Sequence, residues 1–203
     1  VGLVRAVRES GDGARGRTPL GTGAAQSDGA RHRRPRVVVL VVGETVRDDH
    51  WGLNGYARQT TPALAARGVI NFPDVTACGT STEVSLPCMF SAEGRAGFDH
   101  GRVRRQQSVL DVVARAGIHV LWRDNQSGCK GTCVDVLSET LGPVDGPALC
   151  SKGRCFDEIL LSNLEQRIAA GDGDVLLVLH MLGNHGPTYF ERYPPQYRRW
   201  LPV

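Results

Sequence analysis

The sequence RVVVLVVG, at residues 36–43, decides the fold. Its six central residues, 37–42, are all valine or leucine, which is the length of one buried strand and far short of the ~20 residues that cross a bilayer. An apolar run without polar alternation is typical of a parallel strand that is covered on both faces. We therefore expect a central strand here.

Three further segments have the composition of strands, at residues 69–75, 118–122 and 174–182, the last with its core at 175–179. Pro73 has no backbone N–H to donate, so the first of these segments is expected near a sheet edge. The other two are short apolar runs that alternate with predicted helices. This order predicts right-handed crossovers, with the runs at 37–42, 118–122 and 175–179 side by side in one mostly parallel sheet.

Helical periodicity is found between the strands. A short helix is predicted at residues 62–66, where proline occupies a first-turn position that tolerates a missing N–H. Residues 108–116 and 156–170 predict two longer helices, which stop at Gly117 and Gly171. The predicted fold class is therefore α/β, with helices packed on the faces of the sheet.

The chain divides at the start of the first strand. Residues 1–35 mix Gly, Arg, Ser and Ala without a sustained period and are predicted to be a linker or arm, whereas residues 36–203 are predicted to be one domain. The net charge of +3 is small, so we interpret the two arginine clusters as solvated surface rather than as contacts to nucleic acid or anionic lipid. The clusters are Arg31, Arg33, Arg34 and Arg36, and Arg102, Arg104 and Arg105.

The six cysteines lie in three close pairs, Cys78 with Cys88, Cys129 with Cys133, and Cys150 with Cys155. Local pairing is the simplest of the roughly 15 connectivities that six cysteines allow, and it would place the protein in an oxidising compartment. The alternative is a structural zinc site built from the last four cysteines, although their spacers of three and four residues differ from the usual Cys-x2-Cys spacing. We expect the three local disulfides.

Polar residues leave the predicted strands at their carboxyl ends, where open parallel sheets bind ligands. Glu44 follows the first predicted strand, Asp124 and Asn125 follow the third, and His180 and His185 lie at the end of the last. A single acidic residue after a strand often only caps the next helix. A carboxylate, an amide and two imidazoles at one sheet edge instead indicate a metal or phosphate site.

The segment CGTSTEVSLPC, at residues 78–88, adds a candidate nucleophile, Thr82. Its hydroxyl-rich start, followed by Glu83, is typical of a helix N-terminus, where backbone N–H groups favour an anion. A threonine in this position is by default an N-cap. To attack phosphorus its hydroxyl needs a metal or a base beside it, and a zinc ion held by Glu44 would serve.

Five motifs between residues 37 and 202 carry a family resemblance: VVGETVRDD, NGYARQTTP, CGTSTEVSLPCMFS, WRDNQSGCKG and LHMLGNHGPTYFERYP. In this order they resemble successive blocks of the phosphoethanolamine-lipid A transferases, which include the colistin-resistance enzymes. The resemblance implies an alkaline-phosphatase-like α/β/α sandwich with a mostly parallel sheet.

The resemblance also implies roles for individual residues. Glu44 would ligate zinc, and Thr82, bound to the same zinc, would be the nucleophile that carries the phosphoethanolamine group. His185 matches a histidine placed near the transferred phosphate, and Lys130 matches a lysine in the substrate pocket. Two further substrate-binding candidates are Asn125 and His180.

The activity so implied is zinc-dependent transfer of phosphoethanolamine from phosphatidylethanolamine to a lipid A phosphate, through a phosphothreonine-type intermediate. Such enzymes sit in the bacterial inner membrane with the catalytic domain in the periplasm. The family's N-terminal transmembrane helices are missing here, and its Asp-His-Gly-Glu block, with the other zinc ligands, would lie beyond Val203. We therefore expect the chain to be truncated at both ends and the sandwich to be incomplete at its C-terminus.

Three other interpretations remain open. A sulfate-ester hydrolase of the same superfamily needs a Cys/Ser-x-Pro-x-Arg pattern, but Met89 stands where the arginine is required after Ser85. A phosphoglycerol transferase or phosphodiesterase would keep a threonine nucleophile. A disulfide-stapled binding module without catalysis would explain the cysteines, but such modules rarely contain buried parallel strands.

Overall fold

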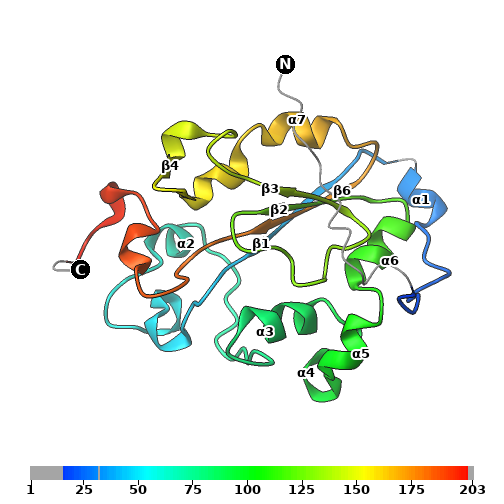
Figure 1. Cartoon of the computed structure of the whole chain (residues 1–203), viewed down its shortest axis with the longest axis horizontal. Helices are drawn as coiled ribbons and strands as arrows, with labels where there is room; N and C mark the ends of the chain where they lie inside the picture. Colours follow the sequence, from blue (N-terminus) through cyan, green and yellow to red (C-terminus); the bar gives the residue numbers. More distant parts are fainter. Residues whose placement is uncertain (1–15, 32, 201–203) are drawn as a thin grey trace.

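A computed structural model of the chain describes residues 16–31 and 33–200, and a four-stranded parallel sheet lies at its centre (Figure 1). The strand order is β1-β6-β2-β3. The bounds are Val37–Val42 for β1, His119–Asp124 for β2, Leu137–Thr140 for β3 and Val175–His180 for β6. Strand β6 pairs with both β1 and β2, so the predicted parallel arrangement of these three runs is confirmed.

Helices lie on both faces of the sheet, as predicted. Figure 1 shows α3, α5 and α6 on one side and α7 on the other. The α-helices are α1 Asp28–Arg31, α2 Pro62–Ala66, α3 Thr82–Met89, α4 Gly94–Gly97, α5 His100–Arg104, α6 Val109–Arg115 and α7 Leu164–Ala169. The 3-10 helices are η1 Asp48–His50, η2 Gly52–Asn54, η3 Pro147–Leu149, η4 Asp157–Leu161, η5 Tyr189–Glu191 and η6 Pro195–Tyr197. A small antiparallel hairpin is formed by β4 Cys150–Ser151 and β5 Arg154–Cys155.

The core follows from the alternation of side chains along β2 and β6. Trp122 and Val178 are buried in a cluster with residues of α3 and α6. Leu121 and Leu177 point to the opposite face and form a second cluster, against which α7 packs. Each fully buried side chain of this size contributes roughly 1.5–3 kcal/mol of transfer free energy, so both faces of these two strands hold the sheet to its helices.

The prediction that residues 37–42 form a central strand covered on both faces is wrong in its position. Within the described residues β1 lies at the edge of the sheet, and β6 takes the central place. Val38 and Val41 are 57% and 55% exposed, and of the whole strand Val42 alone is buried. The apolar run indicated a strand suited to burial on both faces, but which elements cover a strand depends on the rest of the fold.

The strand predicted at residues 69–75 is not formed. Ile70, Phe72 and Val75 are 85%, 72% and 74% exposed, so these three side chains pack little against the described residues. Pro73 removes one ladder donor. Apolar β-branched composition alone therefore did not produce a strand here.

The helix predicted at residues 156–170 is broken into η4 and α7. The buried Arg123 side chain donates to the backbone oxygens of Leu160 and Ser162, both at 2.8 Å. These carbonyl groups bond to a guanidinium instead of to a helical N–H, and Asn163 has a left-handed backbone with φ 54°. The buried Arg123 of strand β2 thus interrupts the helix predicted at residues 156–170.

The other two predicted helices are confirmed as α2 and α6. The Ser108 side chain caps α6, and the Asp111 carboxylate accepts a hydrogen bond from the Ser108 N–H, forming a capping box. The arm predicted at residues 1–35 is partly attached to this helix. Arg17 has a buried side chain that pairs with Asp111 at 3.1 Å and with Asp135 at 3.2 Å. Residues 1–15 of the arm lie outside the described residues.

The three predicted disulfides are present, Cys78–Cys88, Cys129–Cys133 and Cys150–Cys155. All six cysteines are therefore paired, and the alternative of a four-cysteine zinc site is wrong. In the part of the chain that the structure describes, no helix has the length and apolar character needed to span a bilayer.

Asp174, just before β6, ties the starts of two strands together. It accepts hydrogen bonds from the Arg33 side chain and from the Arg36 N–H, the latter at 2.8 Å, and the Arg33 partner lowers the pKa of Asp174 to about 2. A carboxyl whose pKa is depressed in the folded state stabilises the fold above its ordinary pKa, and this contribution is lost as the pH falls through the folded value.

We predict that Asp174→Asn lowers the urea midpoint of unfolding at pH 7, because an amide cannot pair with Arg33. The midpoints of wild type and variant should converge as the pH falls from about 4 towards 2, where the wild-type carboxyl is protonated too. Unfolding curves across this range test the prediction. A gap between the two proteins that stays constant down to pH 2 would contradict it.

Candidate active site

Glu44 leaves the carboxyl end of β1 on a strained turn. The next residue, Thr45, has φ 51°, which for a β-branched residue is an unusual conformation that costs about 1–3 kcal/mol. The Thr45 hydroxyl donates to Glu44 Oε1 at 2.6 Å. Gly183 of the loop after β6 packs so closely that a Cβ there would lie 2.9 Å from the Glu44 carbonyl oxygen. Thr45 thus holds the Glu44 carboxylate, and Gly183 packs against the Glu44 backbone.

Thr82 is the first residue of α3 and faces Glu44. Its hydroxyl donates to Glu44 Oε2 at 2.6 Å, over a separation of 38 residues in the sequence. The N-cap of the helix is Ser81, so the alternative in which Thr82 is a plain N-cap is wrong. The disulfide Cys78–Cys88 brackets this segment and limits its movement.

Gln126 completes the immediate surroundings of Glu44, and sequence reasoning missed it. Its side-chain amide donates to Glu44 Oε2 at 2.9 Å. The available signal was its place just after β2, in the same motif as Asn125. Amides at a strand end have many structural uses, so composition alone could not single out Gln126.

The charge of Glu44 is stabilised by these contacts. Partial burial raises the pKa of Glu44, but hydrogen bonds from Thr45, Thr82 and Gln126, together with the charge of His185, outweigh burial and hold the pKa below its ordinary value. Glu44 is therefore ionised at neutral pH. An ionised carboxylate bonded to a hydroxyl is an acceptor for that hydroxyl's proton and a ligand for a cation.

Glu44 and Thr82 fit a zinc site in part. Zinc is held by three or four protein ligands in known sites. The carboxylate and the hydroxyl provide two adjacent oxygen donors, while the described residues contain no group of three His, Cys, Asp or Glu side chains able to hold a metal. These residues therefore supply part of a donor set.

His180, at the end of β6, forms a buried pair with Asp124 at the end of β2. The His180 Nδ1 and Asp124 Oδ1 atoms are 2.6 Å apart, and both side chains are almost fully buried. Burial raises the pKa of Asp124, but hydrogen bonds from His180 and the Gly128 N–H outweigh it and lower this pKa overall. The carboxylate thereby fixes the orientation of the imidazole, which lines the same cavity as Thr82.

Three other predicted site residues are not among the groups that hydrogen-bond to the Glu44 side chain within the described residues. Asn125 donates to the Cys155 carbonyl at 3.1 Å and to Asp157 at 2.8 Å, so its amide joins two loops. Lys130 has φ 53° and its ammonium donates to Ser127, to the backbone oxygen and to the hydroxyl, both at 2.7 Å. His185 is exposed on the loop after β6. Their substrate-binding roles stay predictions.

A cavity of about 1040 Å³ opens between the ends of β1 and β6 and helix α3. Glu44 and Thr82 lie on its wall, and apolar side chains line much of the rest, among them Trp51, Leu64 and Met89. A polar centre beside a broad apolar wall suits an amphipathic molecule that carries a phosphate group.

Similarity to known proteins identifies the family of the chain. Residues 36–203 match the family model described as Sulfatase. The chain is 46% identical over 171 residues to phosphoethanolamine transferase EptA of Escherichia coli K12 and 43% identical over 189 residues to phosphatidylethanolamine transferase Mcr-1 of Escherichia coli. These alignments cover 84% and 89% of this chain but 31% and 35% of the two relatives, so the chain spans about a third of their length.

Solved structures give the same result. The integral membrane protein lipooligosaccharide phosphoethanolamine transferase A of Neisseria meningitidis superposes with a TM-score of 0.87 at 47% identity, over 92% of this chain and 35% of that one. The crystal structure of its soluble domain superposes with a TM-score of 0.86, over 92% of this chain and 56% of that one. The predicted fold class and the predicted resemblance are therefore both confirmed.

Two glycines of the loop after β6 provide a matched test of the packing around Glu44. Gly183 and Gly186 both have positive φ, 50° and 74°, but a Cβ at Gly186 would have its nearest neighbour at 3.8 Å. Alanine at either position costs ~1–2 kcal/mol of backbone strain. Only Gly183→Ala also collides with Glu44, so we predict that it destabilises the protein by at least ~1 kcal/mol more than Gly186→Ala. Equal unfolding free energies for the two variants would contradict this packing.

Proposed function

The chain belongs to the sulfatase family, and from this premise we propose that it transfers phosphoethanolamine from phosphatidylethanolamine to a phosphate of lipid A, with Thr82 as the nucleophile. The observation that carries the proposal is the 2.6 Å hydrogen bond from the Thr82 hydroxyl to the ionised Glu44, at the wall of an amphipathic cavity. The names of the relatives point to the same transferred group, and a more distant relative, at 34% identity, is Kdo(2)-lipid A phosphoethanolamine 7''-transferase of Salmonella typhimurium.

The first step forms a bond between Thr82 Oγ and phosphorus and breaks the bond from phosphorus to the glycerol oxygen. The threonine proton passes to Glu44, its hydrogen-bond acceptor, and from there to the departing diacylglycerol. Phosphoethanolamine is then esterified to Thr82. In the second step the P–OH oxygen of a lipid A phosphate attacks the same phosphorus and breaks its bond to Thr82 Oγ, and the proton of that P–OH passes through Glu44 to Thr82.

Zinc, held in part by Glu44 and Thr82, would act as a Lewis acid that lowers the pKa of the hydroxyl and offsets charge on the phosphoryl oxygens. The chain's own groups supply the rest. Helix α3 begins at Thr82, so its N-terminal backbone N–H groups and its dipole are proposed to stabilise negative charge on the phosphoryl oxygens. His185 and Lys130 are proposed to neutralise the remaining charge, and the buried Asp124 keeps the His180 ring fixed beside the cavity.

The proposed place of action is the periplasmic side of the bacterial inner membrane. Three disulfides suit an oxidising compartment. Among the structural relatives, the Neisseria enzyme is an integral membrane protein, and the matching domain of EptC of Campylobacter jejuni, at 32% identity, is periplasmic. Sulfate-ester hydrolysis is disfavoured because position 89, where that reaction needs an arginine, holds a methionine. The Met89 side chain is 60% exposed and lines the cavity.

We predict that Thr82→Ala abolishes transfer in the full-length protein while zinc stays bound, because the hydroxyl that attacks phosphorus is missing. Mass spectrometry of wild-type protein incubated with phosphatidylethanolamine should find phosphoethanolamine on Thr82. Thr82→Ser keeps a hydroxyl and is the matched control, so it should retain measurable transfer. The modification on another residue, or near-normal lipid A modification by Thr82→Ala, would refute the mechanism.

Glu44→Ala should lose zinc and activity together, since it removes both a metal ligand and the acceptor of the Thr82 proton. The zinc content per protein molecule, measured by inductively coupled plasma mass spectrometry, distinguishes Glu44→Ala from the two variants described next. Lys130→Ala and His185→Ala should keep zinc and lose about 100-fold or more in kcat/KM, because each is proposed to stabilise charge in the transition state. Full zinc occupancy in Glu44→Ala would rule out its assigned role.

A further inference from the structure

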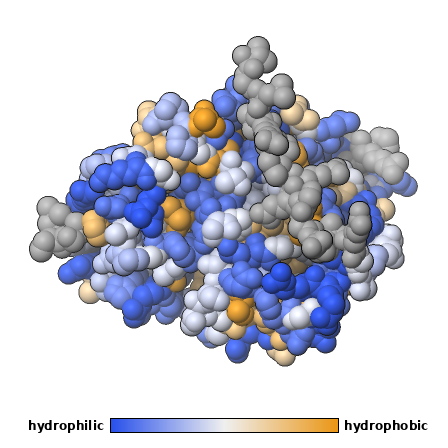
Figure 2. Space-filling view, in the orientation of Figure 1, coloured by the Kyte–Doolittle hydropathy of each residue, from blue (hydrophilic) through white to orange (hydrophobic). Residues whose placement is uncertain are grey.

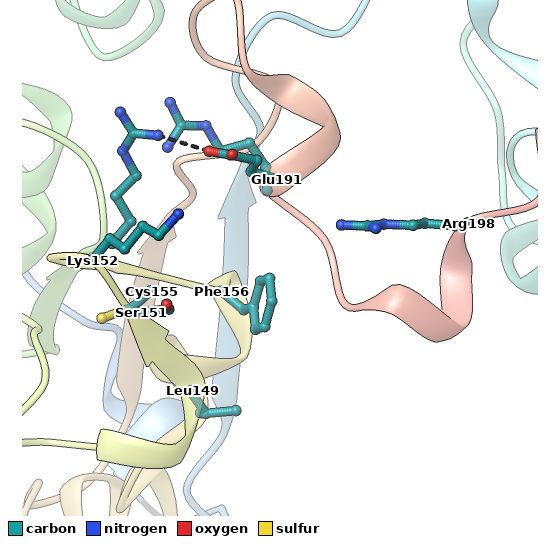
Figure 3. Close-up of a pocket in the computed structure, with 9 residues that line it drawn as sticks. Leu149, Ser151, Lys152, Cys155, Phe156, Glu191 and Arg198 are labelled. Carbon is teal, nitrogen blue, oxygen red and sulfur yellow. Dashed lines mark hydrogen bonds and ion pairs between the residues drawn. The ribbon is translucent and has the colours of Figure 1, made fainter. Parts of the chain in front are cut away.

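A second cavity, of about 200 Å³, lies beside the β4–β5 hairpin and outside the candidate active site (Figure 3). The hairpin forms one wall, and the residues after the Gly-Asn-His-Gly-Pro loop form the other. In Figure 3 the Lys152 ammonium and the Arg198 guanidinium point inward from opposite sides, above the ring of Phe156. A water molecule takes up about 30 Å³ of liquid, so the space admits a group of several heavy atoms.

The cavity is strongly basic. One lysine and three arginines line it against a single carboxylate, that of Glu191. Glu191 is engaged by Arg154, with Arg154 Nη1 3.0 Å from Glu191 Oε2. Among the described residues no carboxylate oxygen lies within 4.0 Å of the other three cations, so they leave an uncompensated positive charge. Those three cations are Lys152, Arg192 and Arg198.

Lys152 occupies a backbone position that does not favour lysine. It has φ 51° and Gly153 has φ 74°, so the two form the tight turn of the hairpin, where Asn-Gly is the preferred pair. The disulfide Cys150–Cys155 joins the two strands directly below the turn. A strained residue on a stapled hairpin, with its charge aimed into a cavity, indicates a binding role rather than a structural one.

The basic cavity is connected to the candidate active site through one loop. Arg192 Nε donates to the His185 carbonyl at 3.1 Å. On the hairpin side, the Asp157 carboxylate accepts hydrogen bonds from the N–H groups of Leu182 and Gly183 at 2.7 and 2.9 Å. Gly183 is the residue packed against Glu44. A molecule bound in the basic cavity is therefore close to the loop that carries His185.

We propose that this cavity binds a phosphate monoester of the acceptor glycolipid, distinct from the phosphate that reacts at Thr82. Arginine and lysine side chains bind phosphate oxygens through charge-assisted hydrogen bonds, and three cations without carboxylate partners match a dianion. Phe156 and Leu149 provide an apolar surface beside it for the non-ionic part of the molecule. The acceptor assignment rests on the proposed function, whereas the binding of phosphate does not.

The first arm of the test is calorimetric titration of the full-length protein with inorganic phosphate. Lys152→Asn and Arg198→Gln should each weaken binding by ~10-fold, the effect of losing one charge-assisted hydrogen bond. Lys152→Asn also suits the turn, so the unfolding midpoint should stay the same or rise, which separates lost binding from lost folding. Arg95→Gln, an exposed arginine on α4, is the charge-matched control and should leave binding unchanged. Unchanged phosphate affinity in both cavity variants would overturn the proposal.

The second arm measures transfer to diphosphorylated and to monophosphorylated lipid A in detergent micelles. The two cavity variants should raise KM about 10-fold for the diphosphorylated acceptor and leave kcat unchanged, because the cavity binds the acceptor and does not contact the reacting atoms. Weaker phosphate binding with unchanged KM for both acceptors would make free phosphate the ligand and overturn the acceptor assignment. If wild type transfers to neither acceptor, the proposed function fails, and the first arm still decides whether the cavity binds phosphate.

Discussion

The parallel pairing of β6 with both β1 and β2 is the constraint on which the rest of the structure depends. Its register sets His180 opposite Val42 on one side and opposite Asp124 on the other. The three strands therefore end at the same level, and the loops that carry Glu44, Gln126 and His185 start from one edge. Neighbouring parallel strands run in the same direction, so residues distant in the sequence meet where the strands end.

Buried charges at this edge are arranged so that each has a partner. Asp124 receives the His180 ring, and Arg123, next to it on β2, pairs with the buried Glu139 on β3 at 3.2 Å. Taking charges out of water costs several kcal/mol each, and pairing with hydrogen bonds offsets this cost. The Arg123 guanidinium also donates hydrogen bonds to the carbonyl oxygens of Leu160 and Ser162, at the end of η4. These bonds hold the backbone that follows Asp157 in place. Burial of a charge in the sheet thus positions a loop at the edge of the site.

The loop after β6 connects two cavities of different character. The larger cavity is amphipathic and contains the Thr82 hydroxyl and the Glu44 carboxylate. The smaller cavity, beside the β4–β5 hairpin, is basic. Figure 2 shows that hydrophilic residues cover most of the face in view, with apolar side chains in scattered groups. The Asp157 carboxylate anchors one end of the loop and Arg192 the other. These two contacts restrict the movement of the loop relative to both cavities.

The sequence by itself determined the α/β class, the three parallel strands, the disulfide pairs and the place of Glu44 at a strand end. Each follows from a local pattern: an apolar run, two cysteines close in the chain, or a polar residue at a strand end. Only the tertiary structure decided that β1 lies at the sheet edge within the described residues, that Arg123 breaks the helix predicted at 156–170, and that Gln126 bonds to Glu44. Each of these depends on which distant residues pack or bond together, and a local pattern does not specify a partner that is far away in the chain.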